Sequence, residues 1–315
     1  MKNLLILGGE GFIGRNCLEY FHKKGEYNIT STYFSKIKNE RIEGVNYVKV
    51  DLRNENEVKN LLKDKQIVIQ AAATTTGSKD VVNSPFVHVT DNAVMNSWVF
   101  REAHLNKVEH VIFFSCTVMY QSKNTKQKES DWTESERIYE KYFGVGNTKV
   151  YLEKMCEFYS SLGSTKFTAI RHSNVFGPYD KYDLDKCHVV PAFVNKIVNA
   201  DKHLDVWGDG TAERDIIYID DLVNFVDLVI EKQKNGYELL NCGYEKSFSI
   251  FELAQMIMEI ENKSLEIQLN TSAPNIPTTV VLDCEKSKKL LGWEIKNDIR
   301  EGLKKTINWY KKNYL

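Results

Sequence analysis

The 315-residue sequence lacks paired cysteines, long apolar runs and any excess of charge of one sign. No apolar stretch is long enough to cross a membrane, and Gly8, Gly9 and Glu10 interrupt the first one too early for a signal peptide. The scattered cysteines contain no Cys-x-x-Cys pair, so we expect neither disulfides nor a metal, in keeping with a reducing cytoplasm. The six are Cys17, Cys116, Cys156, Cys187, Cys242 and Cys284.

Charge is balanced, with 42 Lys and Arg against 43 Asp and Glu, a net charge of -1. There is no basic tract with interleaved aromatic residues, which argues against nucleic-acid binding. Internal repeats and low-complexity linkers are also missing. A chain of this length can bury a large core, and we expect one large or two unequal domains.

A glycine-rich stretch follows the first apolar run. Leu4 to Leu7 predicts a buried strand, glycines stand at 8, 9, 11 and 14, and a helical pattern then begins. Such a turn lets the backbone approach a pyrophosphate, and a helix N-terminus supplies amide groups to it. The alternative is an ordinary tight turn between a strand and a helix.

Strands and helices alternate through the first half of the chain, which predicts a Rossmann-type, doubly wound parallel sheet. We expect this dinucleotide-binding domain over residues 1–175, with a later stretch of about 211–243 returning to it. After Gly177 and Pro178 the segments become shorter, so 176–315 is expected to be mainly a discontinuous substrate lobe. Expected helices are 15–24, 54–63, 91–105, 147–163, 248–260 and 299–310; expected strands are 28–33, 45–50, 67–71, 108–115 and 166–171.

Six motifs in this order and spacing resemble the extended short-chain dehydrogenase/reductases that act on nucleotide sugars. The resemblance covers nearly the whole chain, and 188–192, His-Val-Val-Pro-Ala, is similar to the GDP-sugar enzymes related to GDP-fucose synthase. The motifs are the glycine loop 8–14, Asp51-Leu52, Ala71-Ala72-Ala73, Phe114 to Tyr120, Arg171 to Pro178, and Trp207 to Leu222.

The resemblance assigns cofactor contacts along the carboxyl edge of the sheet. Asp51 would accept from the adenine amino group, although it is also placed to cap helix 54–63. Thr74, Thr75 and Thr76 would bind ribose or sugar hydroxyls or form a plain polar loop. The expected cofactor-binding residues are Gly8, Gly11, Phe12, Ile13, Gly14, Asp51, Leu52, Ala71, Ala72, Ala73 and Lys149.

The second strand ends in residues 30–36 with no acid to bind the ribose 2′-OH of NAD. Lys36 and Lys38 would suit the 2′-phosphate of NADP, or are solvated surface. We expect NAD because we expect an oxidation, and NADP stays open.

On the substrate side, the resemblance places Arg214 and Asn174 on the sugar diphosphate, where a guanidinium fork suits phosphate oxygens. Asn174 is otherwise a turn residue. His188 matches an acid/base histidine of the GDP-sugar enzymes, with Val189 beside it, and Trp207 would pack on the base or in the core. A GDP-sugar is the favoured substrate.

The catalytic pattern departs from the family's Tyr-x-x-x-Lys pair. Lys149 stands where the lysine is expected, but Val145 stands four residues before it. Tyr142 is the nearest candidate base, because Gly144 and Gly146 allow the chain to bend. Cys116 occupies the usual serine position, and its neighbours Ser115 and Thr117 are candidate hydroxyl partners.

Other departures restrict the reaction. Thr117-Val118 replaces the Asp-Glu pair of the dehydratases, and Val118 replaces the epimerising cysteine of GDP-fucose synthase. Hydride chemistry at C4 remains: oxidation to a 4-keto sugar, as in the GDP-heptose 4-dehydrogenases of bacterial capsule synthesis, or reduction or epimerisation. A catalytically silent cofactor-binding protein is the alternative class. By analogy, a homodimer is expected through helices 91–105 and 147–163.

Overall fold

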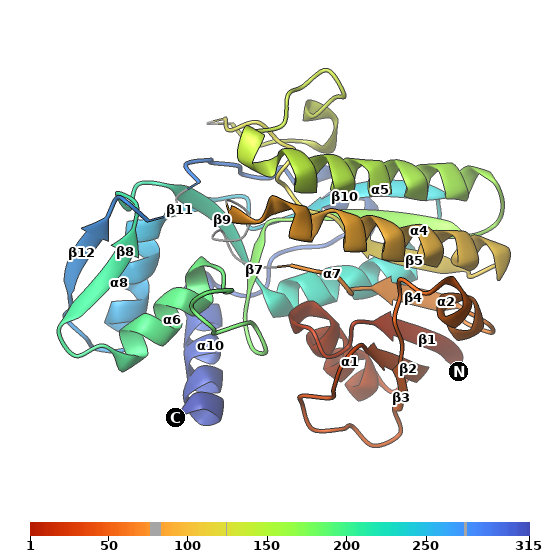
Figure 1. Cartoon of the computed structure of the whole chain (residues 1–315), viewed down its shortest axis with the longest axis horizontal. Coiled ribbons are helices and arrows are strands. Elements are labelled where there is room, and N and C mark those ends of the chain that lie inside the picture. Colours follow the sequence, from red (N-terminus) through yellow and green to blue (C-terminus); the bar gives the residue numbers. More distant parts are fainter. Residues whose placement is uncertain (76–82, 124, 274–275) are drawn as a thin grey trace.

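The computed structural model describes residues 1–75, 83–123, 125–273 and 276–315. A seven-stranded parallel sheet, ordered β10-β6-β5-β4-β1-β2-β3, is its central element (Figure 1). Its strands are β1 (Lys2–Leu7), β2 (Tyr27–Tyr33), β3 (Asn46–Lys49), β4 (Ile67–Gln70), β5 (His110–Phe114), β6 (Lys166–His172) and β10 (Tyr237–Cys242). The chain order reverses beside β1, where open α/β sheets bind their ligands.

Helices cover both faces of this sheet (Figure 1). On one face lie α2 (Glu55–Leu61), α4 (Thr90–Leu105) and α5 (Phe143–Ser161); on the other lie α1 (Phe12–Lys24) and α7 (Ile219–Lys232). Strand residues alternate between the two cores, with Leu4 and Ile6 in one and Leu5 and Leu7 in the other. Burial on both faces explains why β1 is continuously apolar from Leu4 to Leu7.

A second lobe contains two small sheets and three helices, at the left of Figure 1. One sheet is β11-β9-β7, from β7 (Asn174–Phe176), β9 (Glu213–Tyr218) and β11 (Ser247–Ser249); the other pairs β8 (His203–Trp207) with β12 (Glu266–Asn270). The helices are α6 (Val189–Asn199), α8 (Ile250–Ile260) and α10 (Ile299–Tyr314); α9 (Glu285–Leu291) precedes α10. β7 begins two residues after β6 ends, so the large sheet leads directly into this lobe.

The predicted fold class is confirmed, with differences at the boundaries. α1 begins at Phe12 and α5 at Phe143, three and four residues earlier than expected, because glycines are tolerated in both first turns. α6 and α7 were not predicted as helices. In the described ranges, no helix has the length and apolarity that a membrane crossing needs.

Candidate active site

The glycine loop packs against its neighbours with no room for side chains. Gly8 has φ +78°, and a Cβ there would lie 2.7 Å from the Cα of Ala72. The Gly8 amide donates to Thr32 Oγ1 and the Gly9 amide to Thr32 O, both at 3.0 Å. The loop is thereby fixed against β2 and against the residues after β4.

The first turn of α1 follows this loop directly. Gly11 is its N-cap and supplies no side-chain cap, so amide groups of the first turn are left for a ligand. Phe12 and Ile13 are half-buried, Gly14 is buried, and Ala71, Ala72 and Ala73 border the loop on the other side. Small residues and open amides together fit the pyrophosphate of a dinucleotide.

Asp51 follows β3 at the carboxyl edge, as expected. Its two oxygens accept from Arg53 Nε and Nη2 at 2.9 Å, and the hydrogen bonds from Arg53 lower the pKa of the carboxyl. The cap of α2 is Asn54, so the capping alternative for Asp51 is wrong. Leu52 is buried beneath, and Thr76 lies outside the described residues.

Lys149 lies seven residues into α5 and reaches the end of β5. Its Nζ donates to the Phe114 carbonyl at 2.7 Å and lies 4.8 Å from the Phe113 ring centroid. Burial lowers the pKa of this ammonium. Lys149 therefore presents a partly desolvated cation beside the strand end that carries Cys116.

The three residues after β5 differ in their surroundings. Ser115 is buried, and its hydroxyl donates to Glu153, which forms a buried ion pair with Arg171 at 2.7 Å. Cys116 and Thr117 are half-buried, and burial raises the pKa of the Cys116 thiol while Lys149 opposes this. The Ser115 hydroxyl is engaged in a structural network, whereas Cys116 and Thr117 border the site.

Tyr142 caps the start of α5 and has a cationic neighbour other than Lys149. Arg214 and Thr278 lie beside its phenol and lower its pKa, Cys116 raises it, and the larger effect of burial leaves the pKa raised. The structure thus brings Tyr142 near Cys116 but pairs it electrostatically with Arg214, and the expected bend is wrong, because Gly144 and Gly146 lie within the first turns of α5. Its role as the base stays a prediction.

Arg214 and Asn174 come together through the pairing of β7 with β9. Asn174 Nδ2 donates to Asp215 O at 3.0 Å, which places the amide next to Arg214. The guanidinium donates to the carbonyls of Glu213, Ile276 and Thr278 at 2.6–2.7 Å. An amide and a desolvated guanidinium on adjoining strands form a suitable site for phosphate oxygens.

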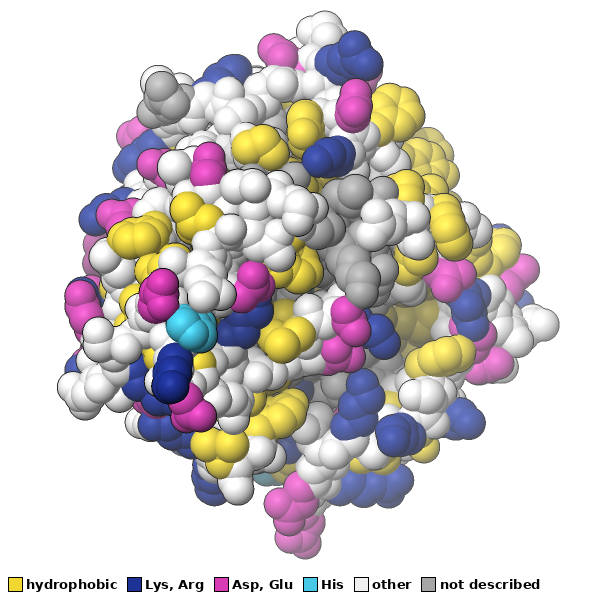
Figure 2. All heavy atoms as spheres, turned by 60° about the vertical axis from the view of Figure 1, so that its left-hand side comes forward, with side chains coloured by type: hydrophobic (Ala, Val, Ile, Leu, Met, Phe, Trp, Pro, Cys, Tyr) yellow, Lys and Arg dark blue, Asp and Glu magenta, His cyan; other side chains and the backbone are white. Residues whose placement is uncertain are grey.

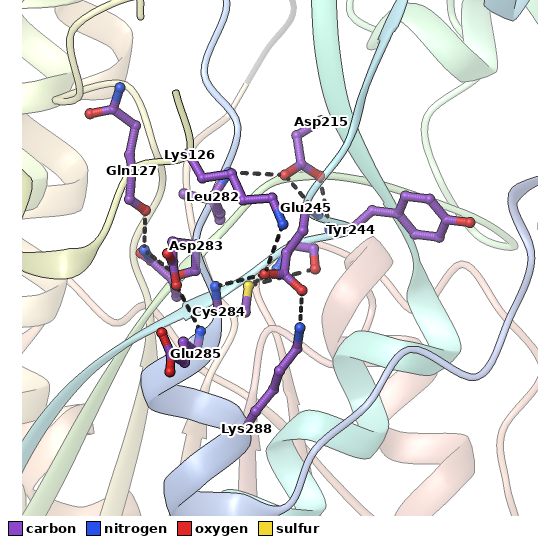
Figure 3. A network of polar contacts seen from close by, with 12 residues as sticks. Lys126, Gln127, Asp215, Tyr244, Glu245, Leu282, Asp283, Cys284, Glu285 and Lys288 are labelled. Carbon is purple, nitrogen blue, oxygen red and sulfur yellow. Dashed lines mark hydrogen bonds and ion pairs between the residues drawn. The ribbon is translucent and has the colours of Figure 1, made fainter. Parts of the chain in front are cut away.

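A buried carboxylate holds this strand in place. Asp215 accepts from the amides of Tyr244 and Leu282 at 2.9 and 3.1 Å, as Figure 3 shows. In the same figure Lys126 and Lys288 reach Glu245 from opposite sides. These contacts connect β9 to the segment after β10 and to residues 282–288, and thereby fix the backbone that carries Arg214.

Two histidines lie near Lys149. His188 is half exposed as the N-cap of α6, and its Nδ1 lies 3.9 Å from Oδ1 of buried Asp180. His172 ends β6, where burial, Lys149 and His188 lower its pKa to about 4. Of the remaining predicted substrate residues, Val189 packs into the core and Trp207 ends β8 with Lys196 above its ring.

Sequence reasoning assigned no role to His172, Asp180 or the Glu153–Arg171 pair. A histidine at the carboxyl end of a parallel strand was the available signal for His172, because such ends face the ligand. Asp180 and His188 are eight residues apart in an irregular loop, and no periodicity connects them.

Fold and glycine loop together define a dinucleotide-dependent enzyme with a second, smaller lobe. Residues 4–243 match the NAD dependent epimerase/dehydratase family, and the chain belongs to that family. Its cofactor is NAD, which the glycine loop and the open amides of α1 fit. NAD supplies the hydride acceptor or donor.

Several relatives carry the names of enzymes that act on nucleotide sugars. The GDP-L-fucose synthase of Sinorhizobium fredii is 28% identical over 84% of this chain and 86% of that protein. The UDP-glucuronate 4-epimerase of Thermodesulfobacterium geofontis is 25% identical over 99% of this chain and 97% of that protein. The solved structure of the UDP-glucose 4-epimerase of Thermotoga maritima matches with a TM-score of 0.86 and 23% identity. The match covers 99% of this chain and 100% of that one, and it shows that the two folds are alike.

Proposed function

We propose that this enzyme transfers a hydride between NAD and C4 of a nucleotide-diphosphate sugar, giving a 4-keto sugar. The observation that carries the proposal is the juxtaposition of Asn174 and Arg214 on β7 and β9 with Tyr142 and Cys116. This juxtaposition supports a diphosphate site that shares one space with the end of β5, which Lys149 contacts. The sugar would lie between them, with its diphosphate on Arg214.

The favoured substrate is a GDP-sugar used in bacterial surface-polysaccharide synthesis, such as a GDP-heptose for capsule. Support comes from the relative named as a GDP-L-fucose synthase and from His188 and Val189, which precede and begin α6. The absence of an acidic pair or cysteine at 117–118 favours simple hydride transfer over elimination or 3,5-epimerisation. We also infer a cytoplasmic homodimer.

Mixing the purified enzyme and NAD with a panel of GDP-, UDP- and dTDP-sugars tests the proposal. Reduced-nicotinamide absorbance is expected with one GDP-sugar. The proposal would be refuted if no sugar changed the absorbance and calorimetry detected no sugar binding. That result would favour a catalytically silent cofactor-binding protein, the alternative suggested by Val145 at the usual tyrosine position. An epimer recovered without net NADH indicates a 4-epimerase; NADH consumption by a 4-keto sugar indicates a reductase.

The role of Lys149 can be tested against a control lysine on the same helix. Lys149→Met should lower turnover at least 100-fold, because the cation beside the reacting carbon is lost. Lys154→Met removes an exposed lysine of the same helix, whose partners Glu134 and Glu157 are also exposed, and should leave turnover unchanged.

A further inference from the structure

His172 is the ionisable side chain at the site to which neither the sequence motifs nor the proposed function assigns a role. It is the last residue of β6 and is half-buried. Its ring packs edge-on against Phe114, with centroids 6.1 Å apart, and the Phe114 carbonyl is the acceptor for Lys149. The imidazole therefore lies at the same strand ends as the lysine.

The hydrogen bond of one ring nitrogen determines the tautomer. Nδ1 lies 2.8 Å from the carbonyl oxygen of Ser173, and a carbonyl can only accept. Nδ1 must therefore carry a proton, and in the neutral ring the lone pair is on Nε2. No hydrogen bond of Nε2 is found in the described part of the chain, so its lone pair is open to a proton donor.

Burial and nearby residues keep the His172 ring neutral. Burial is the main effect that lowers its pKa to about 4, and Lys149 from α5 and His188 before α6 act in the same direction. At neutral pH the ring is thus a hydrogen-bond acceptor with a fixed orientation.

We propose that Nε2 of His172 accepts the proton of the sugar hydroxyl that is oxidised, a role that Val145 cannot fill. This inference rests on the proposed function. The C4–H bond breaks and its electron pair goes to the nicotinamide ring as hydride. The O–H bond breaks and its proton bonds to Nε2, which leaves a C4 carbonyl and an imidazolium. The positive charge of the site is conserved, because the charge lost by the nicotinamide appears on the imidazole.

His188, whose side chain is half exposed, acts electrostatically on His172 and lies beside buried Asp180. Oδ1 of the Asp180 carboxylate lies 3.9 Å from His188 Nδ1, and the other oxygen, Oδ2, is buried without a partner in the described ranges. After the sugar product leaves, the imidazolium of His172 gives its proton to water, which resets the site for the next turnover.

The first test is independent of activity. Nitrogen-15 NMR of the histidines in the full-length protein, assigned with His172→Asn, should show His172 neutral at pH 7 with its proton on Nδ1. A proton on Nε2, or a charged ring at pH 7, would overturn the proposal whether or not a substrate is known.

The second test uses the sugar that reduces NAD in the panel. In His172→Asn the side-chain amide can still donate to Ser173 O, but the acceptor at Nε2 is lost, so kcat should fall at least 100-fold with little change in KM. His203→Asn, an exposed histidine on β8, is the control. In the unmodified enzyme, kcat should keep its plateau down to about pH 6, because a base with this pKa stays unprotonated there.

A His172→Asn enzyme with kcat within threefold of the unmodified enzyme and an unchanged thermal midpoint would show that the ring is only structural. That result leaves the proposed function intact. A panel in which no sugar reduces NAD refutes the proposed function, and the NMR tautomer still decides whether His172 has an acceptor to offer.

Discussion

Tyr142 and Lys149 have different partners, although the family resemblance joins a tyrosine and a lysine in one catalytic pair. The Lys149 ammonium is held on the Phe114 carbonyl, whereas the Tyr142 phenol lies beside Arg214 and Thr278. A phenol next to the guanidinium that would bind the diphosphate, with its pKa raised by burial, stays protonated and can donate to a phosphate oxygen. Substrate binding, rather than proton abstraction, is the chemistry that its neighbours favour.

Tyr142→Phe should therefore raise KM for the nucleotide sugar about tenfold, since a hydrogen bond to a charged group is lost, and change kcat less than threefold. Steady-state kinetics with the active sugar measures both constants. Tyr139→Phe, at a ring 6.1 Å away, is the matched control. A fall in kcat by orders of magnitude at constant KM would instead identify Tyr142 as the base and exclude His172.

At the scale of elements, the contact between the glycine loop and β2 is the tightest part of the cofactor site. A Cβ at Gly9 would lie 1.9 Å from the Oγ of Ser31, and that hydroxyl is buried with no hydrogen-bond partner among the described residues. Removing the hydroxyl would leave the Ser31 Cβ as the nearest atom, at 3.2 Å. The clash is thus mostly with one oxygen atom that has no structural partner.

Gly9→Ala should weaken NAD binding and lower the thermal midpoint, and adding Ser31→Ala should recover most of both losses. Overpacking of this kind costs roughly 1–3 kcal/mol. A double-mutant cycle tests this expectation. NAD binding is measured by calorimetric titration and stability by thermal unfolding, for both single variants and the double variant. Equal losses in Gly9→Ala with and without Ser31→Ala would show that the loop fails for another reason.

The elements that could be predicted are those with local signals. β1, the glycine loop and α1 follow from an apolar run and glycine spacing within 24 residues of the chain. The Arg214 contacts could not be predicted, because its acceptors Ile276 and Thr278 are more than 60 residues away. The position of the Tyr142 phenol depends on those same partners, so no pattern around Val145 could indicate it.

Strands β5 and β6 also carry a buried histidine that is hydrogen-bonded to a threonine. His110 Nε2 lies 2.8 Å from Thr168 Oγ1, and burial, reinforced by Lys166, Lys234 and Lys2, lowers the His110 pKa to about 3. The unfolded chain, with an ordinary histidine pKa of about 6.5, takes up a proton that the folded chain does not. His110 thus contributes stability that is present above pH 6.5 and is lost as pH falls toward 3.

The free energy of unfolding should therefore decrease between pH 7 and pH 4, and His110→Gln should decrease less over the same interval. Glutamine keeps an amide for Thr168 but does not titrate. Urea unfolding at several pH values measures the slope for both proteins. Parallel slopes for the two proteins would mean that His110 does not contribute to the pH dependence.

At the scale of the whole molecule, charge and apolar surface are distributed differently. Acidic and basic side chains are interspersed over the face that Figure 2 shows, in keeping with the net charge of -1. Apolar side chains are exposed on α4 and α5, which pack against each other. On α5 they include Tyr151 and Phe158, with Leu162 at the C-cap of the helix, and on α4 they are Val94 and Leu105.

Tyr151, Phe158 and Leu162 are seven and four residues apart, and Val94 and Leu105 are eleven residues apart. Each set therefore lies along one face of its helix. Two adjacent apolar stripes on a charged surface fit a second copy related by a twofold axis, because each stripe meets an apolar partner.

Phe158→Glu should therefore convert a dimer into a monomer in sedimentation velocity runs, without lowering NAD affinity. Phe251→Glu, an equally drastic change at an exposed phenylalanine of α8, should leave the dimer intact. A monomer in the unmodified protein, or a dimer that survives Phe158→Glu, would place the interface elsewhere or exclude it.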